Sequence, residues 1–341
     1  MMRKIGCLLL LFLLMASLIS VRAEEQPEFK NFRKTLAWVD EQQPEELHLG
    51  TTAFKPSELA EIKAHLPENA VFDFTASFCK AEYTPATEEF SLNGTKSGVT
   101  EKELRALLSL MPQLKKLDTS AHGELSNDIM PDIVDANPQI EFSWVIKLPY
   151  GHHLVSTYTA WSTLNKAFPP GRFSERSCEI LKYAPGLRAL DLGHNRVNDI
   201  SFLKYLPELR LLILADNNVH DLTPISQLKH LQYCELFMNY YSDLSPLSAC
   251  TELLDLNVAF SSVTSLDGLD GCTKLERLWA PKIQQLDPES IERFREKHPD
   301  CELKFNSAGS TGDGWRQHWR YLHYKDLFKT HVWIPFEEAE H

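Results

Sequence analysis

The chain has 341 residues, enough for one long repetitive fold or for two compact domains. It carries 35 basic and 47 acidic residues, a net charge of −12, and this acidic balance argues against nucleic acid or an anionic membrane surface as a partner. It contains no G-x-S-x-G, H-E-x-x-H or phosphate-cradling glycine loop, so these motifs give no support to an enzyme.

The first 23 residues have the pattern of a secretory signal peptide. Arg3 and Lys4 precede an apolar run from Ile5 to Val21, and a cleavage site of small residues follows. We expect cleavage and a secreted or cell-surface protein, with an uncleaved N-terminal membrane anchor as the alternative. Cleavage leaves 32 basic and 47 acidic residues, a net charge of −15. The mature chain is expected to be a monomer without a membrane span.

Residues 24–45 are polar with interspersed aromatic residues, and we predict a lead-in or a short N-terminal cap. From 46 to 148, segments typical of strands alternate with segments typical of helices. A proline ends each helix before the next strand, since proline cannot continue a helix. We interpret 46–148 as irregular, helix-bearing repeats, with a separate α/β domain as the alternative.

Residues 149–186 interrupt this pattern and are predicted to be one irregular repeat or the hinge between two halves. A strand is expected near Trp161 to Leu164, and Pro169-Pro170-Gly171 is expected to form a turn. A helix is expected to follow, leading into the next segment.

An enzyme with its site in 149–178 is a remote alternative. His152 and His153, with Cys178 or Glu175, would be its nucleophile-and-base or metal-binding set. However, adjacent histidines on a strand point to opposite faces, so we interpret them as solvated loop residues. No metal or cofactor is expected.

The stretch 187–286 repeats with a period of 22 residues. The repeats begin at Leu187, Leu209, Leu231, Leu253 and Leu275. In each, two core residues flank one outward residue, which is the pattern of a short strand. A fixed period in the twenties predicts a solenoid, in which each turn buries its apolar face against its neighbours.

These units resemble the leucine-rich repeat, L-x-x-L-x-L-x-x-N-x-(L/I/V), and their length is similar to that of the short repeats of bacterial internalins and eukaryotic phosphatase regulators. The matching residues are Leu187, Leu190, Leu192, Asn195 and Val197; Leu209, Leu212, Leu214, Asn217 and Val219; Leu231, Cys234, Leu236, Asn239 and Tyr241; and Leu253, Leu256, Val258, Ser261 and Val263. With the export signal, the chain most resembles exported bacterial proteins. The resemblance implies an α/β solenoid with a curved parallel sheet on its concave face, helices and 3₁₀ turns on its convex face, and a non-catalytic role in recognition.

Asn195, Asn217 and Asn239 are predicted to form a structural ladder. An amide can satisfy backbone groups of successive turns that would otherwise be buried without partners. Ser261 stands at this position in the fourth unit and can do so only in part. The ladder should therefore weaken there.

Six cysteines follow the signal peptide. Cys250 and Cys272 stand where other repeats carry leucine, so we interpret them as small buried apolar residues. A disulfide between them is the alternative, because equivalent positions on adjacent turns lie roughly 5 Å apart.

The outward positions of the short repeats carry apolar and aromatic residues that a sheet facing only water would not need. The predicted partner-binding residues on the concave face are Leu211, Ile213, Tyr233, Glu235, Phe237, Met238, Phe260 and Trp279. We expect them to form an interface for a protein or a surface glycan. In the intramolecular alternative, the C-terminal tail or the segment 149–178 already fills the concavity.

Residues 287–341 are predicted to form a C-terminal cap with a helix, an edge strand, a flexible link and an aromatic tail. The last core layer of a solenoid must be covered, so the tail is expected to fold over that end, with partner binding by the tail as the alternative. We predict a non-catalytic extracytoplasmic recognition protein; the alternative is a structural or accessory subunit of a cell-envelope assembly.

Overall fold

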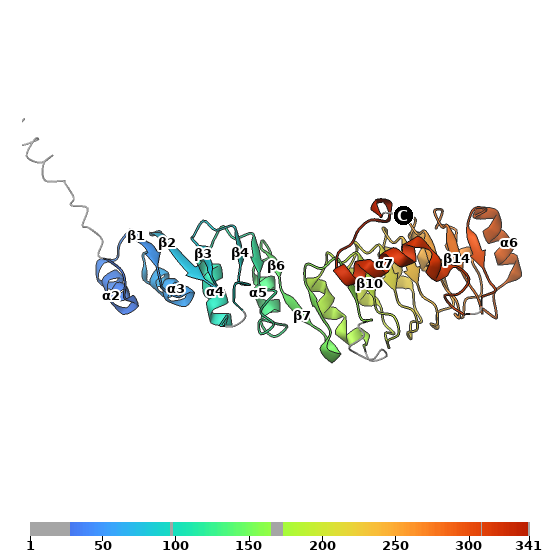
Figure 1. Cartoon of the computed structure of the whole chain (residues 1–341), viewed down its shortest axis with the longest axis horizontal. Helices are drawn as coiled ribbons and strands as arrows, with labels where there is room; N and C mark the ends of the chain where they lie inside the picture. The colour runs from blue at the N-terminus through green and yellow to red at the C-terminus, as the bar shows by residue number, and fades with distance from the viewer. Residues whose placement is uncertain (1–27, 96–97, 165–172, 308, 340–341) are drawn as a thin grey trace, which may run out of the picture. The chain divides into compact units, whose positions relative to one another are not determined.

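The computed structural model describes residues 28–95, 98–164, 173–307 and 309–339 (Figure 1). The chain divides into two compact units, residues 1–87 with 102–113 and residues 88–101 with 114–341. Within the described ranges, no helix is both long enough and apolar enough to cross a membrane. The predicted signal peptide and the turn predicted at 169–171 lie outside the described residues.

The first unit pairs helices with a small sheet. Its elements are α2 (Phe32–Gln42), β1 (Glu46–Thr52), α3 (Pro56–His65), β2 (Val71–Phe78), β3 (Ala81–Tyr83) and α4 (Glu101–Leu110). β1 and β2 are parallel, but β3 returns antiparallel to β2. Cys79 and Lys80 make the turn with φ of 50° and 65°, the left-handed conformation that a two-residue hairpin requires.

The second unit begins with a separate three-stranded parallel sheet, β4 (Glu89–Ser91), β5 (Lys116–Asp118) and β6 (Glu141–Ser143), with α5 (Met130–Ala136) before β6. An antiparallel hairpin of β7 (Val145–Lys147) and β8 (His153–Val155) follows. The strands and helices expected over 46–148 are therefore present. They do not share one sheet, because the β2–β3 and β7–β8 hairpins interrupt the parallel pairing.

The short repeats, with one further strand on each side of them, form one seven-stranded parallel sheet in the order β15-β14-β13-β12-β11-β10-β9 (Figure 1). Its strands are β9 (Ala160–Ser162), β10 (Ala189–Asp191), β11 (Leu211–Ile213), β12 (Tyr233–Glu235), β13 (Asp255–Asn257), β14 (Arg277–Trp279) and β15 (Glu302–Lys304). Leu190, Leu212, Cys234, Leu256 and Leu278 lie one above another in register and are fully buried. The predicted leucine-rich-repeat solenoid is confirmed.

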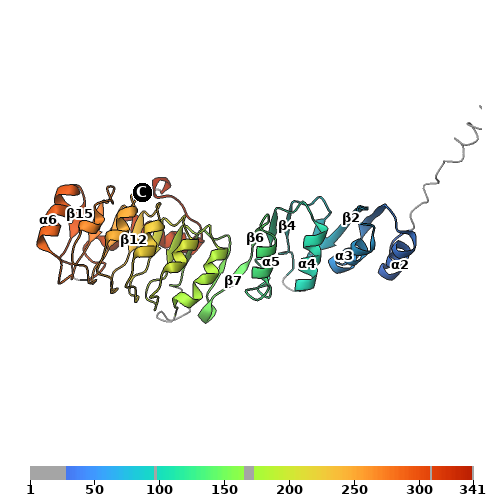
Figure 2. The ribbon, with the colours of Figure 1, turned by 180° about the vertical axis from the view of Figure 1, so that it is seen from behind.

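Short 3₁₀ turns cover the convex face of this sheet, as the view from behind shows (Figure 2). They are η2 (Glu175–Ser177), η3 (Glu179–Tyr183), η4 (Ser201–Tyr205), η5 (Thr223–Gln227), η6 (Ser245–Ala249) and η7 (Asp267–Leu269). Asp221 accepts a hydrogen bond from the backbone N–H of Thr223, and Asp243 does the same for Ser245, both at 2.8 Å. Each carboxylate therefore forms a local turn that binds the first backbone N–H of η5 or η6.

The segment 149–186, predicted as one irregular repeat or a hinge, belongs to the solenoid unit. β9 lies within 149–186 and pairs in register with β10, which makes it a full turn of the sheet. The helix expected after it is instead the two 3₁₀ turns η2 and η3. The chain passes between the two compact units after residues 87, 101 and 113, not within 149–186.

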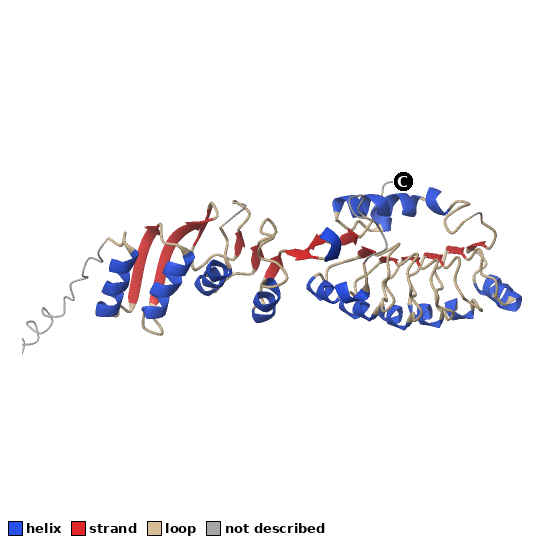
Figure 3. Ribbon diagram, turned by 90° about the horizontal axis from the view of Figure 1, so that it is seen from below, coloured by secondary structure: helices blue, strands red, loops and turns tan. Residues whose placement is uncertain are grey.

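The C-terminal tail does not fold over the end of the solenoid, as first expected, but covers the concave face, as in the intramolecular alternative. α6 (Pro288–Lys297) and β15 end the solenoid, and α6 buries Phe294 there. The tail, with η8 (Trp315–Gln317), α7 (Trp319–Thr330) and η9 (Phe336–Glu338), lies along the concave face, opposite the 3₁₀ turns (Figure 3). Because α6 and β15 already close the end, the tail's aromatic residues pack on the strands instead.

Candidate functional site

The eight predicted partner-binding residues do not form one open surface. Six of them are less than 5% exposed: Leu211, Ile213, Tyr233, Glu235, Phe237 and Trp279. Met238 and Phe260 are 43% and 40% exposed. The expectation of an open concave patch therefore fails for the first six residues, which have the environment of the intramolecular alternative.

The covering segment is residues 309–339, called the strap below. At one end, Trp279 donates its indole N–H to the Gly312 carbonyl oxygen at 3.0 Å, so the strap is held at β14. At the other end, the backbone N–H groups of Thr159 and Ala160 donate to the His331 carbonyl oxygen at 3.1 and 3.2 Å. The strap thus crosses the concave face and occupies backbone donors beside the edge strand β9.

Aromatic side chains carry most of the contact between the strap and the sheet. Trp315 and Tyr324 pack on Tyr233 with ring centroids 5.5 and 5.3 Å apart, and Trp315 packs on Trp279 at 5.2 Å. Other members of this buried cluster include Leu211, Ile213, Phe237, Leu327, Trp333 and Phe336. The strap is therefore part of the core of this unit.

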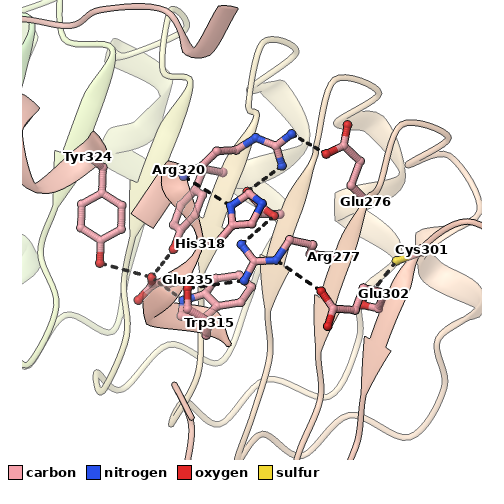
Figure 4. A network of polar contacts seen from close by, with 11 residues as sticks. Glu235, Glu276, Arg277, Cys301, Glu302, Trp315, His318, Arg320 and Tyr324 are labelled. Atoms are coloured by element: carbon pink, nitrogen blue, oxygen red, sulfur yellow. Dashed lines mark hydrogen bonds and ion pairs between the residues drawn. The ribbon is translucent and has the colours of Figure 1, made fainter. Parts of the chain in front are cut away.

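Glu235 is the polar centre of the covered face (Figure 4). Its Oε1 accepts hydrogen bonds from Trp315 Nε1 at 2.8 Å, from the Tyr233 hydroxyl at 2.5 Å and from the Tyr324 hydroxyl at 3.4 Å. Burial raises the pKa of Glu235 to about 7, although these donors oppose the rise. A carboxyl group that titrates near neutral pH therefore lies beneath the strap.

A second network joins Asp255 to two arginines (Figure 4). Asp255 is fully buried and pairs with Arg277 at 3.3 Å and with Arg320 of α7 at 3.1 Å. Arg320 also pairs with Glu276. The Arg277 guanidinium lies over the rings of Trp279 and Trp315, 4.9 and 4.6 Å from their centroids. These contacts compensate charges that would be costly to bury alone.

A cleft of about 600 Å³ remains between the sheet and the strap. Its floor includes Gly193 and Ala215. They stand at the repeat position that Phe237 occupies in the next turn. Because glycine has no side chain and alanine carries only a methyl group, the floor is hollow between Phe237 on one side and Leu164 on the other. The cleft can therefore receive a small molecule.

The lining of the cleft is polar at the floor and the rim and aromatic at the roof. Asp191 and Glu235 contribute buried carboxyl groups from β10 and β12, and burial also raises the pKa of Asp191. The strap contributes Tyr321, Tyr324, Phe328, Arg316, Lys325 and Lys329. Acidic side chains at the floor of the cleft therefore face basic side chains of the strap across an apolar space.

An exposed apolar ridge follows the sheet on the side where the strands end. Its members are Met238, Tyr240 and Phe260, with Tyr240 59% exposed. Met238 and Phe260 have φ of 57° and 54°, which is uncommon for residues other than glycine. Each donates its backbone N–H to a carbonyl of the next turn, at 2.9 and 3.0 Å. The repeat geometry therefore directs these two side chains outward.

The three asparagines bind the backbone of neighbouring turns. Asn217 accepts from the Val197 N–H at 2.9 Å and donates to carbonyl oxygens of its own and the preceding turn. Asn239 makes the corresponding bonds, while Asn195 donates to carbonyl oxygens of its own turn and to the Thr163 hydroxyl. The Ser261 hydroxyl donates to one carbonyl, at 2.7 Å. A hydroxyl offers one donor where an amide offers two, which is the weaker contact expected of serine.

Cys250 and Cys272 are free and buried, and their thiols donate to backbone carbonyls. Burial raises the pKa of the Cys178 thiol, which disfavours the reactive thiolate. His152 packs edge-on against Trp161 and Phe173. It is thus partly enclosed, not a solvated loop residue, while His153 is exposed on β8. Among the described residues, no group of three His, Cys, Asp or Glu side chains could hold a metal ion.

Sequence reasoning did not identify Trp315, Arg320 or Tyr324 as partners of the concave face. One signal was present: Asp255 and Arg277 stand at outward strand positions among apolar residues, and the tail carries both arginine and tryptophan. Charged side chains within an apolar patch need partners of opposite charge. These charged residues would have favoured the alternative in which the C-terminal tail covers the concave face.

No protein-family model and no curated protein sequence matches this chain. Similar solved structures include an internalin, InlF, from Listeria monocytogenes, with 16% identity over 81% of this chain and 87% of that one, and a TM-score of 0.39. An internalin C2 from the same species has 22% identity over 42% and 74%, with a TM-score of 0.32. A leucine-rich-repeat protein from Leptospira interrogans has 17% identity over 76% and 71%, with a TM-score of 0.38. None of these three TM-scores reaches 0.5, so the fold assignment rests on this chain's own stacked repeats.

Proposed function

We propose that this protein is a non-catalytic, extracytoplasmic recognition protein that binds a protein partner through the ridge Met238, Tyr240 and Phe260. The observation that carries the proposal is the exposure of three large apolar side chains on adjacent turns, 43%, 59% and 40%. Exposed apolar groups that cluster in this way are typical of binding surfaces. A leucine-rich-repeat solenoid is rigid enough to present them without rearrangement.

The surroundings of the ridge indicate the chemistry of its partner. Tyr240 stacks on His220, with ring centroids 5.2 Å apart, so its ring is already ordered before binding. Asp221 and Asp243 lie close by in sequence and are exposed. Together with the net charge of −15 expected after cleavage, they favour a partner with an apolar pocket and a basic rim.

The role of the six covered residues changes under this proposal. Leu211, Tyr233 and Trp279 serve to hold the strap, while Ile213, Glu235 and Phe237 reach the cleft. Of the concave-face set, Met238 and Phe260 contact the partner directly. The strap stays in place when the partner binds, because its removal would expose a core of aromatic residues.

A double substitution of Met238→Asn and Phe260→Asn tests the ridge. Asparagine tolerates the left-handed backbone at both positions, so it removes the apolar side chains without adding strain. The matched control is Leu322→Gln, since Leu322 is 52% exposed on the outside of α7. Each form is used to capture partners from envelope or culture extracts, and the captured protein is then purified and titrated directly.

We expect the double variant to lose at least tenfold in affinity for the purified partner, and the control to match the unsubstituted protein. Equal affinity in the double variant and the control would move the binding surface away from the ridge. Capture that persists after the extract is digested with protease would indicate a surface glycan and would overturn the proposal of a protein partner.

The proposed location rests on the signal-peptide pattern of residues 1–23. N-terminal sequencing of the protein recovered from its native source tests it. A mature chain that begins near Glu24 would support export with cleavage. A chain that retains Arg3 and Lys4 and fractionates with membranes would favour the N-terminal anchor instead.

A further inference from the structure

The cleft beneath the strap is separate from the ridge, and the proposed function does not use it. It measures about 600 Å³ and lies between β9–β12 and α7. This volume is within the range of small-molecule sites, roughly 300–1,000 Å³. The interface between the strap and the sheet is otherwise tightly packed. An unfilled hollow within it lowers the stability of the folded protein, because the side chains that line it lose packing contacts.

At the floor of the cleft, one carboxylate oxygen receives no hydrogen bond from the described residues. Asp191 has both oxygens occupied, Oδ1 by the Gly193 N–H at 2.9 Å and Oδ2 by the Ser162 hydroxyl at 2.7 Å. Glu235 is only 3% exposed, and all three of its donors bond to Oε1. Within the described part of the chain, no donor reaches Glu235 Oε2. Glu235 lines the cleft, so a donor from outside the protein can bond to this oxygen there.

The rim of the cleft has the opposite charge. Arg316, Lys325 and Lys329 line it from the strap, and all three are exposed; Lys329 also pairs with Asp326 at 2.6 Å. Between floor and rim, Phe237 and Phe328 provide apolar walls. A simple anion would meet the carboxylates at the floor, and a simple cation would meet the lysines at the rim. A molecule with a positive group at one end and a negative group at the other fits both.

We propose that the cleft binds a short peptide through its free amino terminus. The protonated amine donates to Glu235 Oε2 and lies beside Asp191. The first apolar side chain lies over Gly193 and Ala215 against Phe237. The terminal carboxylate faces Lys325 and Lys329.

Two features of this site favour an amine over an uncharged donor. Two carboxyl groups contribute to one floor, and a single ammonium neutralises charge that burial would otherwise disfavour. An ammonium also carries three donors, which can engage both acids at once. Hydrogen bonds between charged groups are about twice as strong as neutral ones, so the amine should dominate the affinity.

The test titrates the purified protein by calorimetry with the dipeptide Phe-Leu and with two derivatives of it. N-acetyl-Phe-Leu lacks the charged amine, and Phe-Leu amide lacks the carboxylate. We expect Phe-Leu to bind, N-acetylation to weaken binding by at least tenfold, and amidation to weaken it by a few fold, because the exposed lysines are screened by solvent. These comparisons use the unsubstituted protein and do not depend on how any variant folds.

Two variants then locate the site. Glu235→Gln keeps an acceptor for Trp315 but removes the charge, so the affinity for Phe-Leu should fall at least tenfold. Ala215→Leu fills the hollow and should abolish binding. Glu252→Gln is the matched control, since Glu252 pairs with Arg210 and His230 and does not line the cleft. It should bind like the unsubstituted protein.

Three results would overturn the proposal. The first is the absence of any heat of binding with Phe-Leu at millimolar concentration. The second is equal affinity for Phe-Leu and its N-acetyl form. The third is unchanged affinity in folded Glu235→Gln and Ala215→Leu proteins, which would place the peptide elsewhere. The ridge variants are expected to bind Phe-Leu normally, so this test and that of the protein partner fail independently.

Discussion

Trp315 donates its indole N–H to Glu235, a residue 80 positions earlier in the chain, at 2.8 Å. Trp315 is fully buried, and the glutamate stands at an outward position of β12. This contact joins the strap to the middle of the repeat sheet. It also removes from solvent the face that repeat proteins of this architecture leave open for partners.

Replacing Trp279 tests whether the strap is a permanent part of the fold. Trp279 is fully buried between β14 and the strap, so Trp279→Ala should lower the free energy of unfolding by about 3–5 kcal/mol. Phe260→Ala, at a 40% exposed position, should lower it by less than about 1 kcal/mol. Urea unfolding of both variants measures the difference. Equal small losses would show that the strap leaves the sheet readily in solution.

The sheet could be predicted because each repeat shows the strand pattern within its own 22 residues. Leu190, Leu212 and Leu256 recur at fixed offsets, and only stacked strands bury all of them together. The exposure of Met238 and Phe260 also followed from register. Both conclusions rest on patterns that a short stretch of sequence displays.

The strap could not be placed in the same way. Its aromatic residues have no period, and its partners are far away in sequence: Trp315 is 80 residues from Glu235, and Arg320 is 65 from Asp255. An apolar outward face has the same sequence signature whether a partner or the chain itself covers it. The asparagine positions, in contrast, depend on backbone groups of adjacent turns and could be assigned.

Removing the buried carboxylate Asp255 tests the charge network. Asp255→Ala leaves Arg277 without its closest anion and Arg320 without one of its two, so we expect a loss of about 3–5 kcal/mol in the free energy of unfolding. Glu276→Ala is the control: its carboxylate is half exposed and pairs with Arg320 alone, so its loss should be much smaller. Chemical denaturation at neutral pH measures both. Similar losses would mean that the buried pair contributes no more than a surface one.

The raised pKa of Glu235 predicts how stability depends on pH. Burial moves this pKa from 4.5 to about 7, so between these values the folded protein holds a proton that the unfolded chain has released. The free energy of unfolding must therefore fall as pH rises through this range, by roughly 3 kcal/mol for this group.

Comparison with Glu235→Gln isolates this effect from groups that act alongside it. Asp191 also has a raised pKa and acts in the same direction, while burial lowers the pKa of His318 to about 4, which acts in the opposite direction. Both groups are present in the variant. The stability of the unsubstituted protein relative to Glu235→Gln should therefore decline from pH 4.5 to pH 7. A constant difference over that range would contradict the assignment.

In the fourth repeat, where Ser261 replaces the asparagine, a tyrosine hydroxyl makes one of the missing hydrogen bonds. Stability measurements can detect its contribution. The Tyr241 hydroxyl donates to the Leu236 carbonyl oxygen at 3.3 Å, the position that an asparagine in place of Ser261 would reach from the next turn. Asn217→Ala removes several buried bonds and should lower the free energy of unfolding by about 3 kcal/mol or more. Tyr241→Phe removes a single bond and should lower it by about 1 kcal/mol. Urea unfolding followed by tryptophan fluorescence measures both, and an unchanged Tyr241→Phe protein would show that this carbonyl does not depend on the hydroxyl.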